Sequence, residues 1–206
     1  MEDLFFKFGD FKTEINRKIK SRSINIKILF NNFIKRLENN PNIEIQKINH
    51  TFDSLIQLPF DKIYKNYLSH PIRVADSFKF IKTTTDEINF GLCHNIIENG
   101  FLGNLEETHL NKKQVEKIKI LTIDRKKEKE QKYLNEYYDK IENYSEELMI
   151  FKSLDKLDNT LLGTIFPFGE HHVHVVKNYV CPRVKKYNSK IGNYLYDLVD
   201  YVVANR

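Results

Sequence analysis

The chain has 206 residues, of which 41% are hydrophobic and 30% charged, a balance typical of a globular protein with a substantial core rather than of a disordered one. The formal net charge of +5 is mild, and the lysines are scattered, which argues against a nucleic-acid binder and suits a small anionic ligand. No window reaches about 18 uninterrupted apolar residues, so we expect no membrane-spanning helix.

The two cysteines and the first residues indicate a compartment. Cys93 and Cys181 form neither a disulfide framework nor a metal-binding spacing. The opening "MEDLFFKFGD" lacks the basic region and the long apolar run of a signal peptide. We therefore expect reduced cysteines in a cytoplasmic protein.

The spacing of apolar residues is helical in the first part of the chain. In "SINIKILFNNFIKRLENNP" (23–41) the apolar residues share one helical face, with Ser23 as the expected N-cap. The next stretch, "IEIQKINHTFDSLIQLP" (43–59), starts with a strand-like alternation, but its continuation favours a helix. "HPIRVADSFKFIK" (70–82) opens with Pro71, which suits a first helical turn.

Helical patterns continue through the middle of the chain. In "TTTDEINFGLCHNIIENG" (83–100), Thr84 and Glu87 fit a capping box and Gly100 fits a C-terminal cap, so we expect one amphipathic helix between them. The charged "DRKKEKEQK" (124–132) is interpreted as a solvated helix face or a break between helices. Ser145 is the expected N-cap of the helix that follows.

The last part predicts a loop with Gly163, Pro167 and Gly169, followed by two helices broken near Pro182. Strand patterns are nearly absent from the sequence, so we predict an all-α fold: a compact, single-domain helical bundle over residues 1–206. The motif-bearing core is expected at about 60–165, with N-terminal helices (1–58) and C-terminal helices (170–206) packed on it.

Several polar residues fall on otherwise apolar helices, and they are the candidate site: His70, His94, Asn95, Glu98 and Asp155. Four residues separate His94 from Glu98, so a helix would place both on one face. Asp155 is flanked by leucines, and burying its carboxylate is costly unless a cation or hydrogen-bond donors meet it.

Two imidazoles and a carboxylate are reasonable ligands for a divalent transition metal such as Mn²⁺ or Fe²⁺. Such a metal would acidify a bound water and hold a phosphoryl oxygen, and Glu98 would be placed to orient or deprotonate that water. The alternative stays open from spacing alone: a histidine on an apolar helix is usually a hydrogen-bonded core residue.

Three motifs, taken in order, resemble the HD superfamily of metal-dependent phosphohydrolases. They are "YLSHPIRVA" (67–75), "GLCHNIIENG" (91–100) and "FKSLDKLDNTL" (151–161). The pattern is most similar to the hydrolase domain of the RelA/SpoT alarmone enzymes and their small relatives, which read "HP..VA", "LLHD.VED" and "KLADKL.N". The resemblance covers roughly residues 60–165 and implies an HD-type helical bundle.

Carried over by position, the resemblance implies a metal-contacting set and a catalytic pair. The metal set is His70, His94, Asn95 and Asp155. The pair Glu98 and Asn99 would serve the nucleophilic water and the phosphate end of the substrate.

The resemblance also implies substrate contacts. Asn159 and Tyr67 match residues that shape the nucleoside pocket. Lys62 lies near a basic position that packs on the base, although this chain has "DKIY" where the family has Arg-Lys-Ser-Gly. From the sequence itself, Arg73 is expected to face the same pocket, where it pairs with a phosphate or with Asp76 or Glu98. Two lysines, Lys152 and Lys156, flank Asp155. They are interpreted either as positive charge that attracts an anionic ligand or as side chains that extend to solvent.

Two departures from the family weaken the implied site. His-Asp is His94-Asn95 here, and Glu-Asp is Glu98-Asn99, so two negative charges are missing. An amide oxygen can ligate a metal, but it is a neutral donor and accepts no proton.

The resemblance implies a hydrolase that uses one divalent metal, Mn²⁺ or else Fe²⁺, Mg²⁺ or Co²⁺, to remove the 3′-pyrophosphate of a guanosine nucleotide such as ppGpp. Two alternatives remain. The same chemistry could act on another nucleotide, such as a dNTP, a nucleoside monophosphate or a cyclic nucleotide. Alternatively, the chain could be an HD-fold module that binds a nucleotide or a partner protein without catalysis.

Two further regions attract attention. The cluster His171, His172 and His174 suits a loop or strand better than a helix face, and we interpret it either as an approach to the substrate or as chance surface histidines. The aromatic tail is interpreted as core or as a homo-oligomer contact, through Tyr187, Tyr194, Tyr196 and Tyr201.

Overall fold

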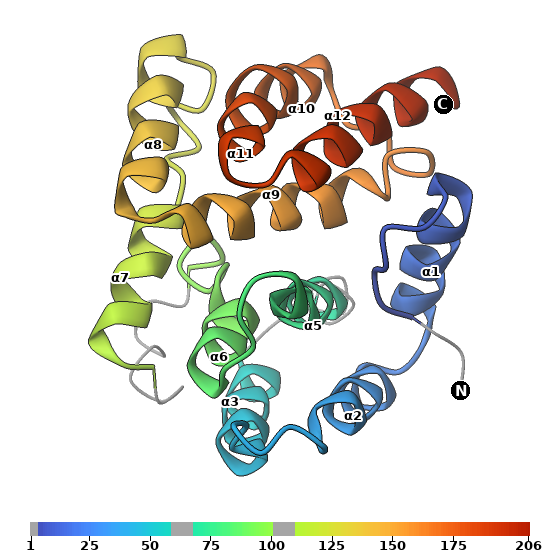
Figure 1. The fold of residues 1–206 in the computed structure, drawn as a ribbon, viewed down its shortest axis with the longest axis vertical. Helices are drawn as coiled ribbons and strands as arrows, with labels where there is room; N and C mark the ends of the chain where they lie inside the picture. Colours follow the sequence, from blue (N-terminus) through green and yellow to red (C-terminus); the bar gives the residue numbers. More distant parts are fainter. Residues whose placement is uncertain (1–3, 59–67, 101–109) are drawn as a thin grey trace. The chain divides into compact units, whose positions relative to one another are not determined.

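The computed structural model describes residues 4–58, 68–100 and 110–206, and the regular structure in these ranges is helical, which confirms the all-α prediction (Figure 1). The elements are α1 (Phe11–Ser23), α2 (Ile26–Leu37), α3 (Ile45–Gln57), α5 (Ser69–Asp76), η1 (Ser77–Phe80), α6 (Thr85–Cys93), α7 (Lys112–Leu121), α8 (Gln131–Tyr144), α9 (Glu146–Thr160), α10 (Glu170–Val175), the π-helical η4 (Val176–Val180), α11 (Cys181–Tyr187) and α12 (Ser189–Ala204).

The chain divides into two compact units. Unit 1 comprises Met1–Phe6 and Ile19–Thr122, and unit 2 comprises Lys7–Lys18 and Ile123–Arg206. The boundary therefore falls inside α1, after Lys18. The expectation of a single domain stays a prediction.

Helix α6 organises unit 1. It packs against α3, α5 and α7, and Figure 1 shows it among these helices. The approach to α5 depends on Gly91, because a Cβ there would lie 3.0 Å from Ala75 Cα and 3.0 Å from Phe78 Cε2. A glycine thus lets the two helix backbones pack closely, three residues before His94.

Helix α9 organises unit 2. It packs against α8, α11 and α12, and it is buried on nearly every side, as its apolar composition predicts (Figure 1). The expected N-cap is confirmed: the Ser145 side chain accepts a hydrogen bond from Leu148 N at 3.1 Å. The core helix of unit 2 therefore carries Asp155 and Asp158 in a buried setting.

Helix starts agree with the sequence patterns, with one correction. The cap of α2 is Asn25, whose side chain accepts from Lys27 N at 2.9 Å, and not Ser23. Ser23 instead donates to Lys20 O at 2.8 Å and closes α1. The Thr84 side chain caps α6 by accepting from Glu87 N at 3.2 Å, which is half of the predicted capping box, and the Glu87 carboxylate pairs with Lys117.

The prediction that the two C-terminal helices are broken near Pro182 is wrong. Helical structure runs from Glu170 through Pro182 to Tyr187, and the break falls at Asn188, whose side chain caps α12 by accepting from Ile191 N at 3.1 Å. Proline has no N–H to donate to the carbonyl four residues earlier, as each residue inside an α-helix does. The π-helical segment η4 comes directly before Pro182 and widens the turn where that bond is missing.

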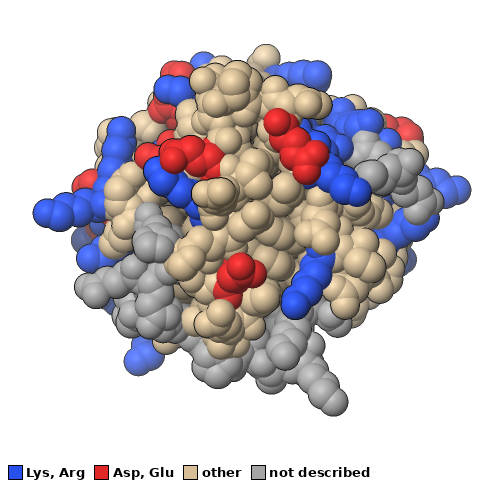
Figure 2. All heavy atoms as spheres, turned by 90° about the horizontal axis from the view of Figure 1, so that it is seen from below, with Lys and Arg blue, Asp and Glu red and all other residues tan. Residues whose placement is uncertain are grey.

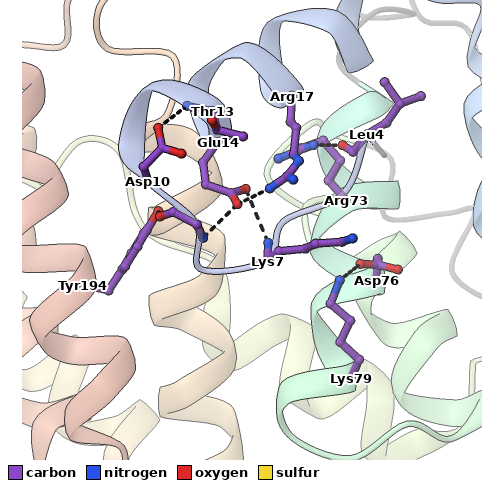
Figure 3. A network of polar contacts seen from close by, with 11 residues as sticks. Leu4, Lys7, Asp10, Thr13, Glu14, Arg17, Arg73, Asp76, Lys79 and Tyr194 are labelled. Carbon is purple, nitrogen blue, oxygen red and sulfur yellow. Dashed lines mark hydrogen bonds and ion pairs between the residues drawn. The ribbon is translucent and has the colours of Figure 1, made fainter. Parts of the chain in front are cut away.

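A buried glutamate orders the segment before α1 in unit 2 (Figure 3). Glu14 is fully buried, and its carboxylate accepts from Gly9 N at 3.0 Å and Lys7 N at 3.4 Å and pairs with Arg17. Gly9 leaves room for this carboxylate, since a Cβ would lie 2.9 Å from its Oε1 atom. The Tyr194 hydroxyl donates to Gly9 O at 2.9 Å, so side chains satisfy this non-helical backbone.

The surface and the helices also bear on the expected partners. On the face drawn in Figure 2, basic and acidic side chains are interspersed, and its described part carries no continuous basic stripe. Within the ranges that the structure describes, no helix combines the length and the apolar character that crossing a membrane requires.

Candidate functional site

Two of the predicted site histidines lie together in unit 1. His70 is on α5, and His94 is the first residue after α6. Both are buried, with 3% and 2% of their surface exposed, and their ring centroids lie 5.2 Å apart in an edge-on arrangement. The packing of α5 against α6 therefore brings together two imidazoles that are 24 positions apart in the sequence.

A hydrogen bond fixes the orientation of His94. Its Nδ1 atom lies 2.7 Å from the carbonyl oxygen of Gly91. Because a carbonyl oxygen only accepts, Nδ1 carries the proton, and in the neutral ring Nε2 holds the lone pair. Metal-binding histidines are typically oriented in this way, with one ring nitrogen donating to a carbonyl and the other available as a ligand.

The same carbonyl lies where the predicted helix ends early. The expected helix over 85–99 ends at Cys93, and hydrogen-bonded turns cover 94–100. In a continued helix the Gly91 carbonyl would accept from Asn95 N–H, and here the same carbonyl lies beside His94 Nδ1. The chain reaches Gly100 in the left-handed conformation, with φ of 81°.

The residues after His94 therefore do not lie on one regular helix face. Asn95 is 8% exposed and lines a small, mostly apolar pocket together with Asn99, Leu55, Leu68 and Pro71. The Asn95 carbonyl accepts from Asn99 N at 3.1 Å. Glu98 is half-buried in the same turns. The two asparagines thus share one environment, in which a neutral amide is much less costly than a carboxylate.

Asp155 lies in unit 2, on α9, and is 3% exposed. Both of its oxygens have partners on the same helix. Oδ2 lies 3.0 Å from the ammonium of Lys152, and Oδ1 accepts from the Asn159 side chain at 3.1 Å. The sequence required a cation or donors for a carboxylate buried here, and the helix itself supplies both.

The remaining predicted substrate residues lie in different settings. Arg73 is 1% exposed, and its guanidinium donates to the carbonyl of Leu4, both in unit 1 (Figure 3). Lys156 is half-buried on α9, and Asn159 contacts Asp155. Lys62 and Tyr67 lie outside the described residues.

The expectation that the histidine cluster at 171–174 suits a loop or strand is wrong, because these residues lie on α10. The Nε2 atom of His172 lies 3.0 Å from the hydroxyl of Thr160. That hydroxyl lies 2.7 Å from the Lys156 carbonyl and donates to it, so it accepts from His172. Burial, followed by the nearby charge of Lys156, lowers the pKa of His172 to about 3. His174 is exposed and contacts Asn178. The two contacts link His172 to α9 and His174 to Asn178.

Two supporting features were missed by the sequence patterns. Gly91 positions His94 through its carbonyl, and its lack of a side chain lets α5 pack closely. The sequence signal for this role was a glycine three residues before a buried histidine. The second feature is a buried ion pair in unit 2 between Lys18 on α1 and Asp158 on α9. The partners lie 140 positions apart, and no local pattern announces such a pair.

The donor atoms fit a divalent transition metal. Imidazole nitrogen suits Mn²⁺, Fe²⁺, Co²⁺ and Zn²⁺, and a carboxylate oxygen adds the charge that such a cation needs. His70, His94 and Asp155 are buried residues that each offer one such atom. Asn95 would contribute only a neutral oxygen.

Comparisons with known proteins add nothing to this assignment. No protein-family model, no curated protein and no solved structure gives a significant match to the chain. The resemblance to HD phosphohydrolases therefore rests on the three sequence motifs alone.

Proposed function

We propose that this chain is a metal-dependent phosphohydrolase in which His70, His94 and Asp155 together hold one divalent cation. The observation that supports the proposal best is the buried histidine pair, with His94 oriented through Nδ1 on the Gly91 carbonyl. A histidine needed only for packing has no requirement for a second imidazole beside it. The proposal requires that Asp155, from unit 2, supplies the third ligand.

The reaction adds water across a P–O bond: the water oxygen bonds to phosphorus, and the ester oxygen leaves with a proton. The bound cation would supply Lewis acidity toward a phosphoryl oxygen and would acidify the attacking water. Within the chain, His94 presents Nε2 because Gly91 holds Nδ1, and the Asn159 side chain orients the Asp155 carboxylate by donating to Oδ1. Glu98 is the residue proposed to take the proton of the attacking water.

The substrate class proposed is a nucleotide phosphate ester, with the 3′-pyrophosphate of a guanosine nucleotide such as ppGpp as the first compound to test. This choice comes from the motif resemblance. The other members of the test panel are dNTPs, nucleoside monophosphates and cyclic nucleotides.

The test measures phosphate and pyrophosphate release by metal-stripped protein given Mn²⁺, Fe²⁺, Co²⁺ or Mg²⁺, together with Mn²⁺ binding by electron paramagnetic resonance. We expect Asp155→Asn and His94→Gln to lose both binding and release by at least about 10–100-fold, the range that even supporting residues of metal sites show. His174→Gln, which changes an exposed histidine, is the matched control. A wild-type protein that binds no metal, or an Asp155→Asn protein that binds it equally well, would contradict the proposal.

A second function, nucleotide binding without catalysis, is favoured by one observation. Asn95 and Asn99 stand where the family carries two carboxylates, and the charge of Asp155 is already balanced by Lys152. If the wild type binds a nucleotide and releases nothing, while Asn95→Asp gains turnover, the natural protein is a binder.

A further inference from the structure

Lys152 is placed to couple metal binding to anion binding. It is 5% exposed on the buried face of α9, and its ammonium lies 3.0 Å from Asp155 Oδ2. The same ammonium lies 6.0 Å from the centre of the Tyr137 ring, on α8. Burial between a ring and a carboxylate holds this positive charge in place, because a lysine side chain cannot leave such a setting freely.

A cation and Lys152 would compete for one carboxylate. In the metal-free chain the charge of Asp155 is balanced by Lys152. When a divalent cation takes this carboxylate as a ligand, the positive charge at the site exceeds the negative charge of Asp155. Asn95 contributes no charge to offset the excess. The electrostatic requirement then changes from a cation to an anion, and a phosphate group is an anion of suitable size and charge.

From this arrangement we infer that Lys152 makes metal binding and phosphate-ester binding mutually dependent. The metal binds weakly alone and tightly with a phosphate monoester, because the ester neutralises the ammonium that competes for Asp155. By thermodynamic reciprocity, the ester also binds more tightly when the metal is present. This inference rests on the proposed metal site and specifies how that site is loaded.

The coupling is measured as Mn²⁺ affinity of the full chain, by electron paramagnetic resonance, with and without methyl phosphate. Methyl phosphate is the smallest phosphate monoester, and its complex with Mn²⁺ in solution is subtracted from a protein-free titration. We expect the ester to tighten Mn²⁺ binding by about 5- to 150-fold, the usual range of coupling between two ligands.

Variants assign the coupling to Lys152. In Lys152→Met, Mn²⁺ alone should bind more tightly than in the wild type, and the ester should no longer help. Lys152→Arg keeps the charge and should keep the coupling. This variant keeps the inference testable if Lys152→Met folds poorly. The matched control is Lys117→Met, which removes a lysine that is also buried and paired, 2.6 Å from Glu87 in unit 1.

The outcomes separate the two proposals. Coupling in the wild type, Lys152→Arg and Lys117→Met, with its loss in Lys152→Met, supports the inference. Mn²⁺ binding that the ester leaves unchanged overturns the inference and leaves the metal site standing. Coupling that persists in a folded Lys152→Met protein overturns the role of Lys152. Absence of Mn²⁺ binding with and without the ester overturns the proposed function itself.

Discussion

The histidine pair of unit 1 and the aspartate helix of unit 2 bury polar groups in opposite ways. His70 and His94 are held by close helix packing and by one backbone carbonyl. Helix α9 buries two carboxylates, and each has a lysine of its own: Lys152 for Asp155 and Lys18 for Asp158. A buried imidazole needs a single hydrogen bond to be oriented, whereas a buried carboxylate needs a countercharge. The two regions should therefore respond differently to substitution.

The largest effect is expected in unit 2, at the ion pair between α1 and α9. Lys18 and Asp158 are 1% and 4% exposed. Lys18→Met would remove the lysine that pairs with a buried carboxylate and should lower the free energy of unfolding by about 3–5 kcal/mol. Urea denaturation measures this loss.

A control tests whether burial is the cause. Lys132 lies 4.0 Å from Glu136, and both side chains are well exposed. Lys132→Met should leave the urea midpoint unchanged, because solvent screens such pairs. Equal losses for the two lysine variants would contradict the buried-pair explanation.

In unit 1, the contact expected to be most sensitive is the one between Gly91 and Ala75, next to His94. Gly91→Ala would place a methyl group 3.0 Å from Ala75 Cα and should destabilise the chain by about 1–3 kcal/mol, since α5 and α6 must separate. Thermal unfolding measures the change. Gly169→Ala is the matched control, because a Cβ there has nothing within 4 Å. An unchanged Tm for Gly91→Ala would show that this contact does not hold the helices together.

Asn95→Asp distinguishes a weakened metal site from a purely structural one. A carboxylate in the apolar surroundings of Asn95 should destabilise the metal-free protein. A full charge about 4 Å from a cation is worth about 4 kcal/mol at an effective dielectric constant of 20, so Mn²⁺ affinity should rise at least about tenfold. Melting curves with and without Mn²⁺ report both effects. Destabilisation that Mn²⁺ does not reverse would argue against a metal at this position.

At neutral pH the smallest effect comes from His172, because its contribution appears only in acid. Its pKa is about 3 in the folded chain against 6.5 for the free side chain. Below pH 6.5 the unfolded chain takes up a proton that the folded chain refuses. The contribution of His172 to the free energy of unfolding is therefore fully present above pH 6.5. It falls toward pH 3 by at most about 1.4 kcal/mol per pH unit. The His172→Gln protein should lose stability less steeply over this range, and parallel curves would refute the assignment.

The sequence predicted the helices well because their signals are local. Ser145 and Thr84 cap the predicted helices α9 and α6 through contacts three residues away. The errors arose where the local pattern did not decide where a helix ends. The predicted helix stops at Cys93, beside the contact between Gly91 O and His94 Nδ1, and the π-helical η4 carries the helix past Pro182.

The candidate site was only partly predictable for a related reason. Residue type and order along the chain selected His70, His94 and Asp155. Some partners lie within one helical turn of the residue they contact: Gly91 for His94, and Lys152 and Asn159 for Asp155. The approach of His70 to His94 depends on tertiary packing. The close approach of α5 to Gly91 and the Lys18–Asp158 pair are contacts that no local pattern encodes.

The carboxylate of Glu14 has a consequence for the backbone that precedes α1. The amides of Lys7 and Gly9 belong to no helix, yet both donate to this buried side chain. Their protons should therefore exchange with deuterated solvent at rates closer to those of helical amides than to those of a loop. In Glu14→Gln, which retains one acceptor oxygen in place of two, exchange at both positions should accelerate before any helix of unit 2 opens.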